Sequence, residues 1–134
     1  PAILSESICS YCILLALLYI LSRLTMRIWD IPTSQLCRKH LLGEHRELHA
    51  IWTVLTTDKK GYRKHPETLR WEGKLLALFN RHEEEVEEMN RRNYAHHSPL
   101  DRNLASGDPK QTRMVHTIEE QVAILREKGC ECFL

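Results

Sequence analysis

Helical periodicity over residues 34–55 is the feature that most constrains the fold of this chain. At 100° per residue, a set of apolar side chains falls within one narrow stripe of a helix. The stripe consists of Cys37, Leu41, Leu48, Trp52 and Leu55. Pro32-Thr33-Ser34 offers a start for this helix. Strand-like alternation of useful length is absent from the sequence, so the chain is predicted to be all-α.

Two further helices are expected downstream. Pro66 suits the first position of a second helix, whose apolar residues recur at helical spacing to about Asn93. Residues 96–111 contain two prolines and a glycine and are predicted to be irregular. A last helix is expected over about 112–128, with an apolar side made of Val115, Ile118, Val122 and Leu125. The predicted architecture is a compact bundle of about three main helices, with an extra hydrophobic segment before it.

That extra segment has no charge between Ser7 and Ser22. As a helix, these sixteen residues would span only ~24 Å, short of the ~30 Å hydrocarbon core of a bilayer. An acidic residue precedes the stretch and arginines follow it, which does not suit a secretory signal. Three interpretations remain: a membrane anchor, an additional core helix, or translated upstream sequence joined to a gene that starts at Met26. We favour the third, and expect residues 1–25 to be an extension of a helical domain over 26–134.

Charge is distributed unevenly along this domain. The chain has 134 residues, 43% of them hydrophobic, and a formal net charge of +1, which excludes a disordered chain but indicates no partner. Residues 27–81 nevertheless hold eleven Lys and Arg against six Asp and Glu. Lys39 and a basic loop made of Lys59, Lys60, Arg63 and Lys64 are candidate contacts to nucleic-acid phosphates. The alternative is a solvated loop, and residues 83–88 are likewise expected to form a solvated acidic helix face.

Metal binding is the weaker interpretation of the cysteines and histidines. A four-cysteine site can be drawn from Cys9, Cys12, Cys130 and Cys132, but reduced thiols in a cytoplasmic protein are expected instead. His45 and His49 are one helical turn apart and could share an ion. They lie away from the apolar stripe, however, and no third ligand stands out downstream. We therefore expect no metal.

Three polar residues border the apolar stripe of the first helix. His40, Glu44 and Glu47 lie within about 60° of one another on the helical wheel. Carboxylates beside a core are costly to desolvate unless they are paired or used, and their pKa values tend to be raised. The sequence leaves two interpretations open, a functional cluster or a polar network that ties helices together.

At these residues the chain resembles the phage-type pyrimidine-dimer DNA glycosylases. The resemblance rests on Met26-Arg27-Ile28 and on His40-Leu-x-x-Glu44-x-Arg46-Glu47-Leu. It runs without gaps from Met26 to about Leu48 and resumes through the second helix to Arg92-Asn93-Tyr94.

The resemblance implies an all-α DNA-repair enzyme acting on duplex DNA that contains ultraviolet-induced pyrimidine dimers. It implies that the α-amino group at Met26 is the nucleophile and that Glu47 is the catalytic carboxylate. It also implies that Arg27, His40 and Arg46 hold DNA around the lesion, with Glu44 in a supporting role. Base release is followed by strand cleavage through β-elimination, no cofactor is needed, and a monomer is expected.

The chemistry suits these residue types independently of the resemblance. An α-amine has a pKa near ~8, so a useful fraction is neutral and nucleophilic at physiological pH. A nearby carboxylate can stabilise the positive charge that develops at the sugar. If residues 1–25 are attached, however, the nitrogen of Met26 is an amide. The alternative functions are then a non-catalytic binder of distorted or damaged duplex DNA, or a membrane-tethered helical protein anchored by residues 8–21.

Overall fold

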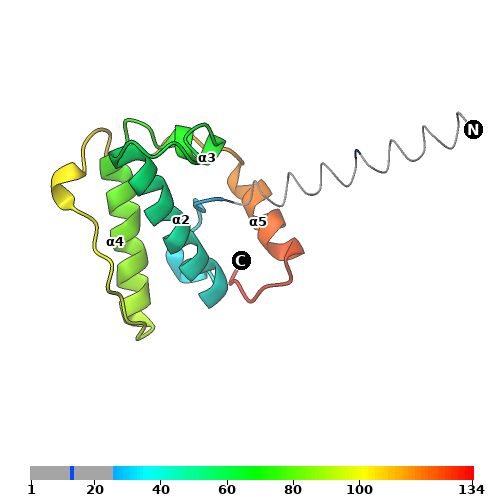
Figure 1. The fold of residues 1–134 in the computed structure, drawn as a ribbon. Helices are drawn as coiled ribbons and strands as arrows, with labels where there is room; N and C mark the ends of the chain where they lie inside the picture. Colours follow the sequence, from blue (N-terminus) through cyan, green and yellow to red (C-terminus); the bar gives the residue numbers. More distant parts are fainter. Residues whose placement is uncertain (1–12, 14–25) are drawn as a thin grey trace, which may run out of the picture.

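Four α-helices and two short 3-10 turns account for the regular structure of the described residues (Figure 1). The computed structural model describes residues 26–134 and Ile13. In chain order the elements are η1 (Thr33–Gln35), α2 (Arg38–Thr56), α3 (Pro66–Arg70), α4 (Leu75–Arg91), η2 (Arg102–Leu104) and α5 (Ile118–Glu127). No strand occurs in this part of the chain, and one isolated bridge joins Lys74 to Gly107. The all-α prediction is confirmed.

The helices pack around an irregular segment formed by residues 26–31, which bends at Asp30 and Ile31. Helix α2 packs against α4 and α3. Leu125 brings α5 into a buried cluster with Leu41 of α2 and Met89 of α4. The predicted stripe of the first helix is confirmed at its centre, where Leu41, Leu48 and Trp52 are buried.

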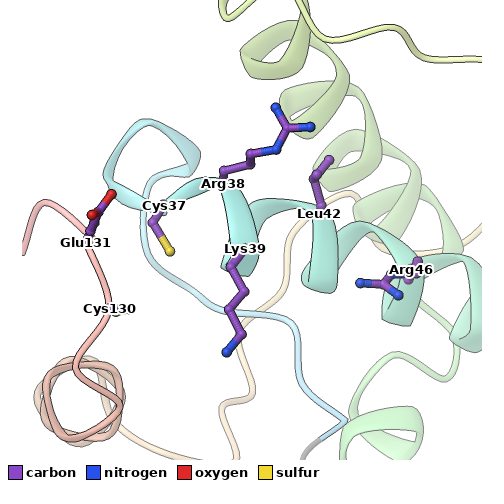
Figure 2. Close-up of a pocket in the computed structure, with 7 residues that line it drawn as sticks. All are labelled: Cys37, Arg38, Lys39, Leu42, Arg46, Cys130 and Glu131. Carbon is purple, nitrogen blue, oxygen red and sulfur yellow. The ribbon is translucent and has the colours of Figure 1, made fainter.

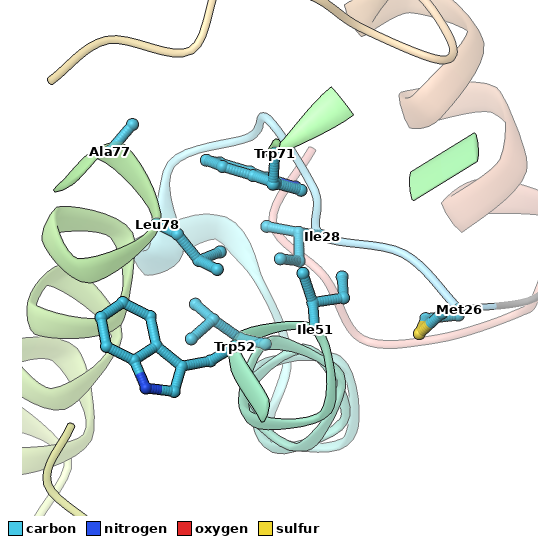
Figure 3. Packing of buried hydrophobic residues seen from close by; sticks show 8 residues of the cluster. Met26, Ile28, Ile51, Trp52, Trp71, Ala77 and Leu78 are labelled. Carbon is cyan, nitrogen blue, oxygen red and sulfur yellow. The ribbon is translucent and has the colours of Figure 1, made fainter. Parts of the chain in front are cut away.

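This irregular segment contributes to two hydrophobic clusters. Met26 and Ile28 belong to the cluster in Figure 3, which also contains Leu48, Ile51, Trp52, Trp71, Ala77 and Leu78. Trp29 and Ile31 belong to the second cluster, together with Leu36, Leu41, Met89 and Leu125. The four apolar residues of the segment are therefore part of the core, whereas Arg27 and Asp30 are half-buried.

The predicted second helix is divided into α3 and α4. The interruption lies over residues 71–74, where Gly73 has a φ of +72°. The backbone of residues 106–108 packs against this turn: Asp108 N–H donates to the Gly73 carbonyl at 3.0 Å. The amides of Leu76 and Ala77 donate to the carbonyls of Ser106 and Asp108. The irregular segment therefore caps the N-terminus of α4, an interaction that helical periodicity could not reveal.

The last helix starts six residues later than predicted, at Ile118. Thr117 and Glu120 form a capping box there, and Val115 is exposed rather than part of the apolar side. The end of the helix agrees with the prediction, since Gly129 has a φ of +62°.

The acidic run is only partly solvated. Glu83, Glu84 and Glu87 are exposed, but Glu85 and Glu88 are buried. The expectation of a wholly solvated face was wrong because the buried side of α4 includes these two positions. Both carboxylates have cationic or imidazole partners, with Glu88 bound by Arg91 and Arg92.

The interpretations of the uncharged N-terminal stretch fall outside the described residues, apart from Ile13. Within the part of the chain that the structure describes, no helix is both long and apolar enough to cross a membrane.

Candidate functional site

The irregular segment at residues 26–31 is held by side chains from three helices. The amide of Ile28 donates to Glu67 Oε1 at 3.2 Å, and that of Trp29 donates to Glu44 Oε1 at 2.6 Å. The amide of Asp30 donates to Gln121 Oε1 at 2.8 Å. These three acceptors come from α3, α2 and α5, so the position of the segment depends on the whole fold.

Arg70 of α3 is a second anchor for this segment. Its side chain is 3% exposed and donates to the Ile28 carbonyl at 2.7 Å and to Asp30 Oδ1 at 3.0 Å. It also donates to Glu67 Oε1 at 2.7 Å. Glu67 and Arg70 therefore form a buried ion pair that satisfies both a donor and an acceptor of the Ile28 backbone.

Glu44 of α2 binds the same segment from another side. Besides the Trp29 amide, it binds Arg81 of α4, whose Nε lies 2.9 Å from Glu44 Oε2. Arg81 also donates to the Ile31 carbonyl at 2.9 Å. Burial raises the pKa of Glu44, as expected for a carboxyl beside the core, and Arg81 opposes this shift. Glu44 is a link between two helices and the segment that begins at Met26.

Met26 and Arg27 line a pocket of about 470 Å³ between α3 and α5. The remaining lining residues are His65, Pro66, Glu67, Val115, His116, Ile124, Glu127 and Lys128. The side chain of Met26 is buried, and Figure 3 shows it at the edge of the hydrophobic cluster farthest from Ala77 and Leu78. Arg27 contacts His116 Nδ1 at 3.2 Å, and its guanidinium lies 5.1 Å from the centre of the Trp29 ring.

His65 is a polar residue of this pocket that the sequence did not single out. Its Nδ1 accepts the Glu67 amide at 3.0 Å, so Nε2 carries the proton of the neutral ring. His65 Nε2 is buried and has no hydrogen-bond partner among the described residues. Burial lowers the pKa of His65, a shift that favours the neutral ring. The sequence feature that could have indicated His65 is its position directly before Pro66, at the start of a helix.

Glu47 is half-buried in the middle of α2. Burial raises its pKa above the ordinary value, and the adjacent Arg46 guanidinium opposes the change. Ile51, one turn further along, belongs to the same hydrophobic cluster as Met26. Glu47 does not line the pocket that contains Met26 and Arg27.

Arg46 and Lys39 line a separate, basic pocket of about 460 Å³ (Figure 2). Arg38 joins them, and the C-terminal residues 130–131 form the other wall. His40 is buried nearby, with its ring edge against Trp29 and its Nδ1 close to two cysteine sulfurs. The predicted DNA-contacting residues are therefore divided among different surfaces of the molecule.

The basic loop between α2 and α3 is exposed at all four predicted positions. Lys59 lines a third pocket together with Tyr62, while Arg63 donates to the Val54 carbonyl at the end of α2. Tyr62 is 62% exposed and has a φ of +61°. An exposed aromatic ring among cations is suited to stacking on nucleic-acid bases, and the sequence alone did not single out Tyr62.

Helix α4 packs against the side of α2 that carries His45 and His49. Both are half-buried, and His45 Nδ1 lies 2.7 Å from Glu85 Oε2. His82 of α4 and His96 of the following segment lie against them. The structure thus supplies the further histidines that the sequence did not reveal. Of the four-cysteine set, Cys9 and Cys12 lie outside the described residues, while Cys130 and Cys132 lie near Cys37.

A family model described as pyrimidine dimer DNA glycosylase matches residues 26–102, which is more than half of the chain. The chain belongs to this family. The family is one of DNA glycosylases, and the substrate that it implies is DNA containing pyrimidine dimers. Comparisons with curated proteins and with solved structures find no match. The family match contains every candidate site residue named from the resemblance, from Met26 to Glu47.

Proposed function

We propose that residues 26–134 act as a DNA glycosylase and abasic-site lyase, with the α-amine at Met26 as nucleophile and Glu47 as the catalytic carboxylate. The observation that carries this proposal is the anchoring of residues 28–30, whose three amides are each bound by a buried side chain. Catalysis by a chain-terminal amine requires this kind of fixed backbone, because an unanchored terminus would lose the advantage of orientation.

The reaction follows from these groups. The neutral amine attacks C1′ of the damaged nucleotide, the bond between C1′ and the base breaks, and the base leaves with the bonding electrons. Loss of a proton from nitrogen and opening of the sugar ring give an imine. Removal of a proton from C2′ then expels the 3′ phosphate and cleaves the strand. Glu47 stabilises the positive charge at C1′ and accepts the C2′ proton.

Its environment supports this assignment for Glu47. A half-buried carboxylate interacts more strongly with positive charge than an exposed one. The pocket beside Met26 is also lined by Arg27, whose guanidinium is suited to phosphate or sugar oxygens. Lys39, Arg46 and the basic loop extend the proposed DNA contact beyond this pocket, and His40 supports the first turn of α2 from within.

The deciding experiment uses two forms of the protein, one that starts at Met26 and one that contains residues 1–134. Each is incubated with a duplex that carries one thymine dimer, and borohydride is added during the reaction to reduce any imine. The form with a free amine at Met26 is expected to give a covalent protein–DNA adduct that maps to residue 26. Blocking that amine by reductive methylation should abolish the adduct.

Glu47→Gln is the matched variant in the form that starts at Met26. It should bind the damaged duplex like the unmodified protein but lose adduct formation and strand cleavage. Trapping at a lysine, or unchanged cleavage by Glu47→Gln, would contradict the proposed roles. Tight binding without any adduct would instead favour the second candidate, a non-catalytic binder of distorted duplex DNA, to which the exposed basic loop is suited.

A further inference from the structure

Four histidines converge where α2, α4 and the segment after α4 meet. They are His45 and His49 of α2, His82 of α4, and His96. One ring nitrogen from each lies within 4.8 Å of those of all the others. The shortest separations join His45 Nε2 to His49 Nε2 at 3.2 Å and to His96 Nε2 at 3.1 Å.

Two of these rings contact a carboxylate through Nδ1, on the opposite side of the ring from Nε2. His45 Nδ1 lies 2.7 Å from Glu85 Oε2, and His82 Nδ1 lies 3.0 Å from Glu83 Oε1. A carboxylate only accepts hydrogen bonds, so each Nδ1 carries a proton and each neutral ring keeps a lone pair on Nε2. His82 Nε2 is buried and has no hydrogen-bond partner in the described part of the chain. Carboxylates that orient histidines in this way are typical of metal centres.

Hydrogen bonds alone do not account for the arrangement. The single lone pair of His45 Nε2 faces two other ring nitrogens at almost equal distance, although it suits only one donor. A tetrahedral ion with metal–nitrogen bonds of about 2.0–2.1 Å places its ligand nitrogens about 3.3–3.4 Å apart. The closest separations here are near that value.

We propose that this four-histidine cluster binds one divalent transition-metal ion, with zinc as the best fit to four imidazole nitrogens. Four protein ligands leave no open coordination position, so the ion is structural. It would join the middle of α2 to α4 and fix the segment around His96. This role is independent of the proposed glycosylase chemistry, since none of these histidines lines the pocket beside Met26.

The test uses the complete chain, stripped of metal with a chelator and titrated with Co²⁺ and with Zn²⁺. The cluster should bind one equivalent of either ion, and Co²⁺ should show the visible bands of a tetrahedral site with nitrogen ligands. Zinc should raise the Tm. His49→Gln and His96→Gln should each lose these bands, whereas the exposed neighbour in His97→Gln should keep them.

Glu85→Gln provides a test that does not remove a ligand. Loss of the carboxylate behind His45 should weaken Zn²⁺ binding about 10–100-fold. Circular dichroism identifies any variant that fails to fold. A folded wild-type chain without these bands would overturn the proposal, as would a folded His96→Gln variant with unchanged Co²⁺ spectra.

A second cluster carries a separate proposal. Cys37, His40, Cys130 and Cys132 also place their ligand atoms within 4.8 Å of one another. His40 Nδ1 lies 3.2 Å from Cys37 Sγ and 3.3 Å from Cys132 Sγ, although one ring nitrogen offers only a proton or a lone pair. Three thiolates and one imidazole are a common ligand set of structural zinc, for which sulfur and nitrogen lie about 3.6 Å apart. We infer that this cluster is a zinc site that fixes residues 130–132 to the start of α2.

Cobalt distinguishes this site from the first. In the complete chain, Co²⁺ bound here should give a near-ultraviolet thiolate-to-cobalt charge-transfer band that the four-histidine site cannot give. Cys132→Ser should abolish it, and Cys132→His should restore metal binding with a weaker band because two thiolates remain. The band should survive in His96→Gln. Its absence from folded wild-type protein with reduced thiols, or its persistence at full strength in Cys132→Ser, would overturn this inference.

Discussion

At the scale of single residues, the environment of Glu47 determines how the proposed reaction depends on pH. Burial raises the pKa of this carboxyl above its ordinary value of 4.5. Its charged form is required, so the single-turnover rate should fall as the pH is lowered through that raised pKa, at a higher pH than for an exposed glutamate. The pH profile of strand cleavage at saturating protein measures this fall in rate, which is the acid limb of the profile.

Arg46→Gln tests the cause of that limb. Because the Arg46 guanidinium lowers the pKa of Glu47, its removal should shift the acid limb to still higher pH. Lys39→Gln is the control, because it removes a cation that lines the same pocket as Arg46 but is not a cause of the Glu47 pKa shift. An acid limb that is identical in all three proteins would show that Glu47 does not set it.

Glu44 and Glu84 both contact Arg81 but differ in burial. Glu44 is fully buried and binds Arg81 at 2.9 Å, whereas Glu84 is 61% exposed at 3.5 Å. Glu44→Gln should lower the free energy of unfolding by about 3 kcal/mol, because it leaves the Arg81 guanidinium poorly paired in a largely buried site. Glu84→Gln should cost only about 0–1 kcal/mol. Urea denaturation compares the two, and equal losses would contradict the anchoring role of Glu44.

At the scale of elements, the start of α4 depends on close contact between two turns. A Cβ on Gly107, whose φ is +87°, would lie 2.1 Å from the Gly73 carbonyl oxygen. Gly107→Ala should therefore displace residues 106–108 from the α4 N-terminus and destabilise the fold by more than the ~1–3 kcal/mol of the backbone conformation alone.

Gly43→Ala is the matched control, because nothing lies within 4 Å of a Cβ at that position in α2. Alanine should stabilise the helix there by about 0.5–1 kcal/mol. Thermal and urea unfolding should thus move in opposite directions for the two variants. If Gly107→Ala left the free energy of unfolding unchanged, the contact between the two turns would not stabilise the fold.

The basic loop between α2 and α3 should contribute affinity without specificity. Lys59→Ala, Lys60→Ala and Lys64→Ala should each weaken binding to damaged and undamaged duplex alike. Each should reduce the slope of log K against log salt by about 0.9 if it removes one phosphate contact. Tyr62→Ala should instead weaken binding to the distorted duplex selectively, through loss of stacking. Fluorescence anisotropy over a salt series measures both effects, with the exposed Lys110→Ala as control.

At the scale of the whole molecule, the sequence predicted what depends on one helix and missed what depends on how helices meet. The buried stripe of α2 and the raised pKa values of Glu44 and Glu47 follow from positions on a single helical wheel. The approach of His82 and His96 to His45 depends instead on the packing of α4 against α2, which no local pattern contains. The same holds for His40 and Cys132, which are 92 positions apart.

The break between α3 and α4 was missed for a related reason. Gly73 was visible in the sequence, but a glycine inside a helical pattern is often tolerated. What decides the break is the distant backbone of residues 106–108, which satisfies the first amides of α4. Similarly, the burial of Glu85 depends on partners supplied by α2 and not on the acidic run itself.

The buried side chain of Arg70 links distant parts of the chain, because it joins the segment that begins at Met26 to α3 and to the carbonyl of Arg113. Lysine cannot make the four contacts of the planar guanidinium, so Arg70→Lys should loosen residues 28–30. If that segment positions the nucleophile, the single-turnover rate should fall at least ~10-fold while the Kd for damaged duplex changes little. Arg113→Ala, which keeps the backbone carbonyl, is the control. Equal losses of rate and binding would instead assign Arg70 to general stability, and hydrogen exchange at the Ile28 and Asp30 amides would show whether the segment has loosened.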